Sequence, residues 1–509
     1  MSRRRRWNTQ YWKWDALARL KEPGCPVCAR HLQEIKSDFF WFVNEQYYEP
    51  EAIADLRRSY GFCPTHTRHL IKTGASSVIT TVFSYLTGYA LSRLQEAQAL
   101  LNHSKDQKNP HDRCRHAAEV LRPQRVCRTC RTQQWWEDHI ISIVLQTLPD
   151  AEVKEAYESS TGLCLPHFHK AGLRADWDSL SFLTREMRKR VMALRISERS
   201  PTLLLDQVGG MDQERLLRHC PKKAEPSEAL SQGEEPLLLR KGWADPKPWS
   251  SAFEDVLALL VEPGCPVCTV CKQGLQTYLN WLVQEMDRVA SPSANWDPSW
   301  KICPTHFWEL RASGHERAAV LIAEHTALEW RWKFDNLAVD LADRPADHLM
   351  DRLARLPAAW SHRTSSARRI ISGLWDVLVR NLESPEQKLD RLRTAPFRED
   401  LCQACYHIQE TTRRTLDLIL RVVEEPTGRK TYSQAWGLCL RHCIEAARIA
   451  EAPAALNELL TAQITRLRIL EWELQEASRK RNWSVRYELK GPEEGAWLRA
   501  AQRFCGSTA

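Results

Sequence analysis

Sixteen cysteine and histidine residues recur in a fixed order along this 509-residue chain. Four times a C-x-x-C motif is followed by a C-x-x-H motif, and the spacers between the two motifs are nearly equal in length, over 29–62, 131–163, 269–302 and 406–438. Three thiolates and one imidazole make a complete tetrahedral ligand set for a zinc ion. In chain order, the predicted quartets are Cys25, Cys28, Cys63 and His66; Cys127, Cys130, Cys164 and His167; Cys265, Cys268, Cys303 and His306; and Cys402, Cys405, Cys439 and His442.

These ligand sets predict metal sites of a structural kind. A closed set of four protein ligands leaves no open coordination position, so it holds no catalytic water. We therefore expect about four zinc ions per chain, and an apoprotein that is largely unfolded. Iron–sulfur clusters are the alternative cofactor, because a histidine can replace one cysteine ligand in them. With such clusters, or with zinc thiolates that are oxidised, the protein would be a redox carrier or sensor.

Two further residues occupy matching positions beside the motifs. Cys271 follows a ligand cysteine by three residues, and the matching position in the first half of the chain is His31. Because four ligands are already present, we expect a small buried residue and an exposed histidine there. The alternatives are groups that contact the ligands, or extra ligands of a larger cluster. We expect that His169 and Cys443, which lie beside ligand histidines, do not bind the metal. The other cysteines outside the quartets are Cys114, Cys220 and Cys505.

The chain contains an internal duplication. Residues 15–28 read DALARLKEPGCPVC, and residues 255–268 read DVLALLVEPGCPVC at the equivalent place in the second half. The later motifs lie further apart between the halves, where Cys127 matches Cys402 and Tyr157 matches Tyr432. The difference between the two spacings places an insertion of about 35 residues within 341–396 of the second half. We predict the following organisation: a first helical half over 1–200, a linker over 201–250, a second helical half over 251–481 and a C-terminal tail over 482–509.

The segments around the motifs have helical periodicity. Leu32, Ile35, Phe39, Phe42 and Val43 share one face at i, i+3, i+4 spacing, and strand-like alternation is scarce. The predicted fold class is therefore all-α, a tandemly duplicated helical array with two Cys3His metal sites in each half.

Each motif is expected to start a helix. In Gly24-Cys25-Pro26, proline suits the first helical position because the N–H that it lacks has no intrahelical partner there. The second ligand then lies one turn further on, and the positive end of the helix favours the thiolate form. A helix of about 20 residues runs roughly 30 Å. A turn and a second short helix, such as 51–59, must therefore bring the chain back, so that the metal closes a local hairpin.

The composition is that of an ordinary soluble chain, with 43% hydrophobic and 27% charged residues and a net charge of +8. The N-terminus has no apolar signal-peptide core, so we expect a cytoplasmic protein in which C-x-x-C spacing indicates metal or redox chemistry. The segment 73–92 is uncharged, but it is rich in Ser, Thr and Gly, and its counterpart near 312–332 is charged. We therefore expect no membrane span.

The motifs resemble those of an uncharacterised family of bacterial cysteine-rich proteins, described as a domain of unknown function. The resemblance is carried by GCPVC at 24–28, GFCPTH at 61–66, CRTC at 127–130 and GLCLPHF at 162–168. It covers roughly 15–195, and a second copy covers 253–475 with departures at KICPTH and GLCLRHC. The family has no assigned activity, so the resemblance implies a bacterial cytoplasmic setting and no substrate.

Two kinds of partner are compatible with the sequence. A zinc-stabilised scaffold with a protein partner is favoured, because the chain has 21 tryptophans and Trp is enriched at interfaces. Nucleic acid is the alternative partner, because both chain ends are basic and aromatic, at 3–14 and 479–487. No phosphate-binding glycine loop, H-E-x-x-H or G-x-S-x-G motif is present, so no catalytic residue is predicted and an enzyme is not indicated. The oligomeric state does not follow from these patterns.

Overall fold

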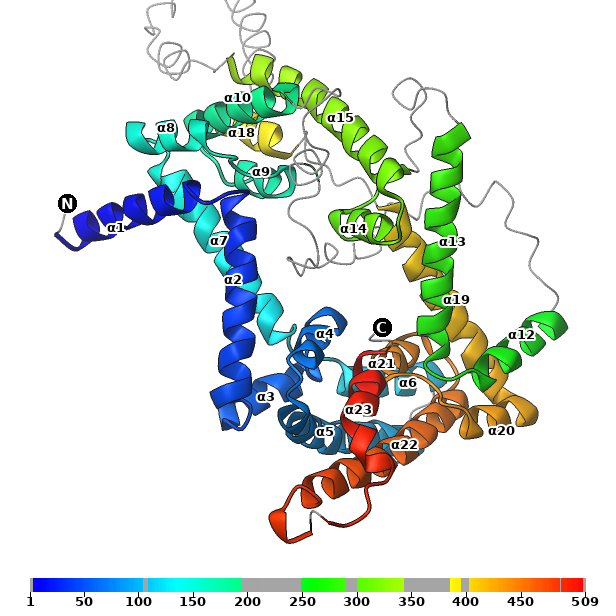
Figure 1. Cartoon of the computed structure of the whole chain (residues 1–509). Helices are drawn as coiled ribbons and strands as arrows, with labels where there is room; N and C mark the ends of the chain where they lie inside the picture. The colour runs from blue at the N-terminus through cyan, green and yellow to red at the C-terminus, as the bar shows by residue number, and fades with distance from the viewer. Residues whose placement is uncertain are drawn as a thin grey trace, which may run out of the picture.

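The fold consists of helices, as the periodicity predicts (Figure 1). The computed structural model describes residues 3–103, 109–193, 208, 249–288, 300–342, 385–394, 402–485 and 487–506. No β-strand occurs within these ranges, which confirms the all-α class. Nearly all of the predicted linker, Cys220 and most of the 341–396 insertion lie outside the described residues.

The helices of the first half include two long ones, α5 and α7, separated by one shorter helix. A π-helical turn, Phe42–Gln46, extends α2 beyond its own end. The helices are α1 (Arg3–Leu20), α2 (Pro26–Trp41), α3 (Pro50–Ser59), α4 (Pro64–Lys72), α5 (Ser76–His103), α6 (Pro110–Leu121), α7 (Arg128–Thr147), α8 (Ala151–Ser159), α9 (Leu165–Gly172) and α10 (Trp177–Ala193).

The second half repeats most of this series at the spacings found in the sequence, so α13, α14, α15, α19, α21 and α22 correspond to α2, α4, α5, α7, α9 and α10. Two short 3-10 helices, Trp483–Val485 and Pro492–Gly495, precede the last helix. The helices are α12 (Trp249–Val261), α13 (Pro266–Arg288), α14 (Pro304–Ala312), α15 (Glu316–Ala342), α18 (Pro385–Thr394), α19 (Gln403–Glu424), α20 (Pro426–Gln434), α21 (Leu440–Ile449), α22 (Pro453–Arg479) and α23 (Ala496–Cys505).

All eight ligand motifs start helices, as predicted. The first cysteine of each motif directly precedes the helix, and the second ligand lies in its first turn. Proline occupies the first helical position in four cases, for example Pro26 and Pro64, where the fixed φ angle suits a helix start. The helices that start in this way are α2, α4, α7, α9, α13, α14, α19 and α21.

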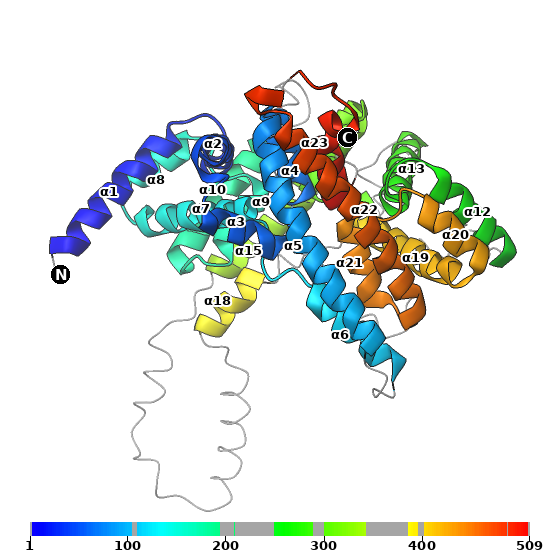
Figure 2. The same ribbon diagram turned by 90° about the horizontal axis from the view of Figure 1, so that it is seen from below.

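Each half is built around a pair of long helices that pack together, α2 with α7 and α13 with α19 (Figure 1). The two pairs are joined at both of their ends by the other helices. At one junction α5 of the first half packs along α22 of the second half, and at the other junction α10 packs along α15 (Figure 2 shows the first). At each junction, therefore, two helices that directly follow C-x-x-H motifs pack together. One follows the first such motif of its half, and the other follows the second such motif of the opposite half.

The hydrophobic core is shared between the halves at both junctions. One large cluster of buried side chains contains Leu86 together with Leu460, and a second contains Leu183 together with Phe334. Polar contacts reinforce the same junctions. Gln98 Nε2 donates to Thr461 Oγ1 at 2.7 Å, for example. Each half therefore buries apolar surface against the other, which couples their folding.

The C-terminal segment takes part in the first junction. Helix α23 packs against α4, α5, α21 and α22. Phe504 is buried, and its ring lies 5.3 Å from the ring of Phe83 on α5. The last helix of the chain thus fills the region where the two halves meet.

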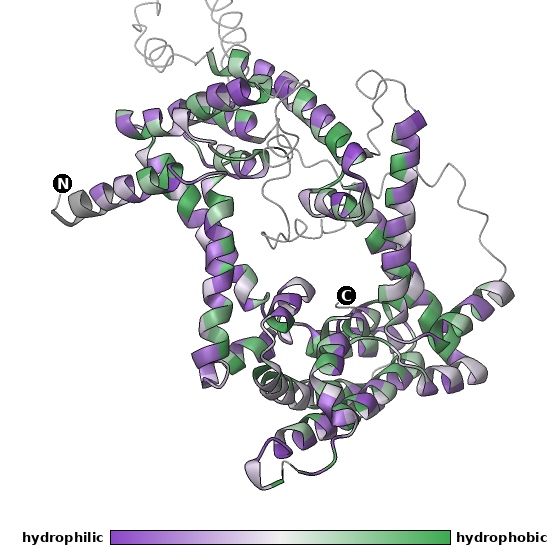
Figure 3. Cartoon of the chain, viewed as in Figure 1, coloured by the Kyte–Doolittle hydropathy of each residue, from purple (hydrophilic) through white to green (hydrophobic). Residues whose placement is uncertain are grey.

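Apolar and polar residues are mixed along the long helices (Figure 3). Among the described residues, no helix is long and apolar enough to cross a membrane. The uncharged stretch noted in the sequence forms the first part of α5, where Ile79, Val82 and Leu86 are buried in the core. Burial in the protein explains its apolar character.

Candidate metal centres

The sixteen predicted residues gather into four Cys3His groups, each of which could hold a metal ion. Within a group the ligand atoms all lie within 4.8 Å of one another. The groups, named by their first residue, are the Cys25 group (Cys25, Cys28, Cys164, His167), the Cys63 group (Cys63, His66, Cys127, Cys130), the Cys265 group (Cys265, Cys268, Cys439, His442) and the Cys303 group (Cys303, His306, Cys402, Cys405).

This grouping corrects the predicted quartets, because the two C-x-x-H motifs are exchanged within each half. The first C-x-x-C of a half joins the second C-x-x-H, and the second C-x-x-C joins the first C-x-x-H. All sixteen predicted residues lie in these groups, whereas the predicted local closure of each quartet was wrong.

Helix length explains the exchange. Helix α2 has 16 residues and its π-helical turn has 5, and together they carry the chain roughly 30 Å away from Cys25. Helix α3 has only 10 residues and runs about 15 Å, so it leaves Cys63 at the far end of α2. Helix α7 then starts beside Cys63 and has 20 residues, enough to return to the Cys25 end. The two antiparallel helices thus carry one group at each end.

The distances within each group suit a single ion. Nδ1 of His167 lies 3.4, 3.3 and 3.1 Å from the Sγ atoms of Cys25, Cys28 and Cys164. The nine equivalent distances in the other groups lie between 3.2 and 3.5 Å. Pairs of Sγ atoms approach to 3.7 Å in three of the groups. Tetrahedral zinc with Zn–S bonds of about 2.3 Å would separate two sulfurs by about 3.8 Å.

Each group lies between the N-termini of two helices, as predicted, although the partner helix differs from the predicted one. The Cys25 group joins α2 with α9, and the Cys63 group joins α4 with α7. The second half repeats this with α13 and α21, and with α14 and α19. Two positive helix ends stabilise thiolates and offset the negative charge of three of them.

A buried carboxylate orients the histidine of the Cys25 group. Glu137 Oε1 lies 3.1 Å from Nε2 of His167, and Lys170 Nζ lies 2.6 Å from the same oxygen. Burial would raise the pKa of Glu137, but hydrogen bonds from His167 and Lys170 outweigh it and lower this pKa below its ordinary value. An ionised carboxylate on Nε2 leaves Nδ1 with a lone pair directed at the three sulfurs. In the Cys303 group, Glu309 is further from its histidine, at 3.7 Å from Nε2 of His306.

His31 and Cys271 lie beside two of the groups without joining them. The prediction of an exposed histidine was wrong: His31 is buried, its Nε2 lies 3.1 Å from the carbonyl oxygen of Gln133, and its ring meets that of His167 edge-on. Cys271 is partly buried and its Sγ lies 3.1 Å from Thr412 Oγ1. Both residues therefore contact the helix that packs beside them.

The loops that lead to Cys164 and Cys439 are held by a duplicated contact. The hydroxyl of Tyr157 accepts a hydrogen bond from the N–H of Leu163, and Arg190 stacks over the Tyr157 ring and donates to its carbonyl oxygen. Gly162, with φ at +66°, packs so closely that a Cβ would come within 2.7 Å of that guanidinium. Tyr432, Leu438, Arg466 and Gly437 make the same contacts in the second half. The tyrosines were found by the internal repeat, whereas the arginines, which lie on the next helix, were missed.

The remaining described cysteines belong to no group. Cys114, Cys443 and Cys505 are buried, and burial raises the pKa of Cys443 and of Cys505 to about 12 in each case. Such thiols stay protonated at neutral pH. His169 also lies outside the groups.

Fold and centres together define a class of protein: a duplicated all-helical chain with a Cys3His group at each end of two antiparallel helix pairs. Residues 14–180 match the model of a family of unknown function, DUF6062, so this part of the chain is similar to that family. The matched segment includes all eight Cys and His residues of the two groups in the first half. No curated protein and no solved structure matches the chain.

Proposed function

We propose that this protein is a non-catalytic scaffold in which four zinc ions fix the helices that present a binding surface to a protein partner. The observation that carries the proposal is the position of the groups at the ends of the long helix pairs. In the Cys25 group the two C-x-x-C cysteines lie 136 to 142 residues from the C-x-x-H residues that they meet, and in the Cys265 group 174 to 177 residues. An ion that closes such long loops restricts the unfolded chain more than one that closes a local hairpin.

Zinc is supported over an iron–sulfur cluster by ligand spacing. A cluster of several irons distributes its ligands over different metal atoms, which spreads the ligand atoms apart. Here three sulfurs and one nitrogen surround a single point in every group, within 4.8 Å of one another. Closed Cys3His sets around one ion are typical of structural zinc. So many thiolate ligands also favour a reducing compartment, consistent with a cytoplasmic protein.

Exposed aromatic side chains support a role in interaction. Trp14 on α1 and Trp332 on α15 are 66% and 67% exposed. Tryptophan provides a large contact area at protein interfaces. Some basic residues near the C-terminus, by contrast, already have partners within the chain. Arg479 pairs with Glu476 and Glu488, for example, which weakens the case for a basic C-terminal nucleic-acid arm.

Elemental analysis and an absorption spectrum of protein purified without oxygen test the metal assignment. We expect four zinc ions per chain, one for each group, and no absorption band in the visible range. A brown protein that contains iron and sulfide would contradict the assignment and favour redox chemistry.

Replacing Glu137 should weaken zinc binding at the Cys25 group. In Glu137→Gln the partner of His167 loses its charge, and changes to such partners cost about 10- to 100-fold in metal affinity. Competition against a chromophoric chelator measures this loss. Glu309→Gln is the matched control, because this carboxylate lies 3.7 Å from Nε2 of His306 and is more exposed. An equal loss in both variants, or none in Glu137→Gln, would exclude this role for Glu137.

A further inference from the structure

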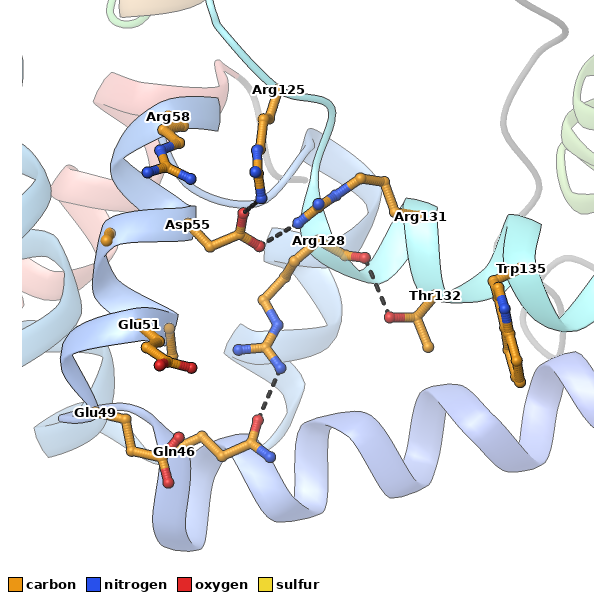
Figure 4. Close-up of a pocket in the computed structure, with 12 residues that line it drawn as sticks. Gln46, Glu49, Glu51, Asp55, Arg58, Arg125, Arg128, Arg131, Thr132 and Trp135 are labelled. Atoms are coloured by element: carbon orange, nitrogen blue, oxygen red, sulfur yellow. Dashed lines mark hydrogen bonds and ion pairs between the residues drawn. The ribbon is translucent and has the colours of Figure 1, made fainter.

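A pocket of about 850 Å³ lies between α3 and the first turns of α7 (Figure 4). Its volume is in the range of small-molecule sites. Four arginines and one tryptophan stand out among its lining residues, which also include Gln46, Glu49, Glu51, Asp55 and Thr132. The arginines are Arg58, Arg125, Arg128 and Arg131, and the tryptophan is Trp135.

The arginine wall has more positive charge than its carboxylate can neutralise. Arg125 and Arg131 both pair with Asp55, and their side chains remain 44% and 40% exposed. Arg58 is exposed on α3 and lies near the same carboxylate in Figure 4. It forms no ion pair within the part of the chain that the structure describes. Three guanidiniums around Asp55 leave two positive charges at this end of the pocket. Because Glu49 and Glu51 also line the pocket, its four arginines and three carboxylates together leave one positive charge. Planar guanidiniums bind phosphate oxygens in pairs.

An aromatic surface lies one helical turn from this wall. Trp135 follows Arg131 by four residues on α7, and its side chain stands at the edge of the pocket in Figure 4. The residue is 56% exposed, and the ring stacks on His139 at a centroid distance of 4.9 Å. An exposed indole whose orientation is fixed in this way can stack on a planar base.

The duplication provides an internal control. When the halves are aligned on Cys127 and Cys402, the residues Arg128, Arg131 and Trp135 correspond to Gln403, Tyr406 and Glu410 on α19. Helix α19 still packs on α13, and the Cys303 group still forms at its start. The helix pair and its ligand group therefore do not require these arginines or this tryptophan, which belong to the first half alone.

We propose that the pocket binds a nucleotide unit, with its phosphate at Arg58, Arg125 and Arg131 and its base on Trp135. A free nucleotide and a nucleotide within a single strand share this chemistry. The proposal goes beyond the scaffold function and does not depend on which metal fills the four groups. The sequence suggested nucleic-acid binding at the basic chain ends, whereas this proposal places it in the pocket.

Binding measurements on the full chain with three probes test this site: inorganic phosphate, adenosine monophosphate and a short labelled single-stranded DNA. Arg58→Ala and Trp135→Ala should each weaken nucleotide or DNA binding at least about tenfold. If the strand binds, Arg58→Ala should also reduce the slope of log affinity against log salt by about one. Tighter binding of the mononucleotide would identify a free nucleotide as the ligand, and binding of the strand alone would identify nucleic acid.

Two control variants make the same chemical changes on other helices. Arg421→Ala removes a 61% exposed arginine from α19, and Trp472→Ala removes an exposed tryptophan from α22. Both should bind like the unaltered protein. The pocket is excluded if neither nucleotide probe binds, if phosphate alone binds as tightly as the nucleotide, or if only deletion of residues 1–9 abolishes binding. Zinc content, measured on every variant, distinguishes failure of this site from failure of the metal assignment.

Discussion

Removal of the metal ions is expected to unfold most of the helical structure. Each group joins two helix starts that are far apart in the chain, and structural zinc contributes on the order of 10 kcal/mol per site. The net stability of a typical domain is only about 5–15 kcal/mol. Without the ions, the three cysteines and one histidine of each group would provide no comparable link. Circular dichroism after treatment with a strong chelator should therefore show a large loss of helix signal.

The shared core makes this loss cooperative. Helices α5 and α10 bury their apolar faces against α22 and α15 of the other half, so loosening one half exposes apolar surface in both. The control is the same chelator saturated with zinc beforehand, which should leave the spectrum unchanged. Re-addition of zinc should restore the signal. Helix content that stays constant after elemental analysis has shown the zinc to be gone would contradict a structural role.

Local chemistry made the helix starts and the residues of the four groups predictable. A cysteine followed by proline sets the helix start at Pro26, and the C-x-x-C and C-x-x-H spacings place both ligands of a motif on one helical turn. The all-helical class followed from periodicity in the same way. These features depend on residues within about one turn of each other, so a single sequence contains them.

The pairing of motifs could not be predicted at that level, because it depends on the path of the chain through space. The segment 29–62, between Cys28 and Cys63, can close a hairpin or span a helix pair, and only the short length of α3 decides between them. The burial of His31 also depends on a distant neighbour, Gln133, on the helix that packs beside it. The docking of α23 and the arginines on α10 and α22 likewise involve contacts between distant segments. The proposed boundaries at 200 and 250 stay a prediction.

The exchanged grouping of ligands leads to the second large effect. The variant Cys25→Ser/Cys28→Ser should lose one zinc ion, because it removes two ligands from the Cys25 group. The other two ligands of that group, Cys164 and His167, then have no ion to bind. Cys164 should change from a protected thiolate to a reactive thiol, whereas the Cys63 group keeps its full set of ligands. The unaltered protein, in which all twelve ligand cysteines should be protected, is the reference.

Alkylation of this double variant, read residue by residue with mass spectrometry, tests the exchanged grouping most directly. The structure predicts rapid labelling of Cys164 and protection of Cys63, Cys127 and Cys130. Labelling of Cys63 with protection of Cys164 would show instead that each quartet closes locally, and would contradict the arrangement of groups at opposite ends of the helix pairs.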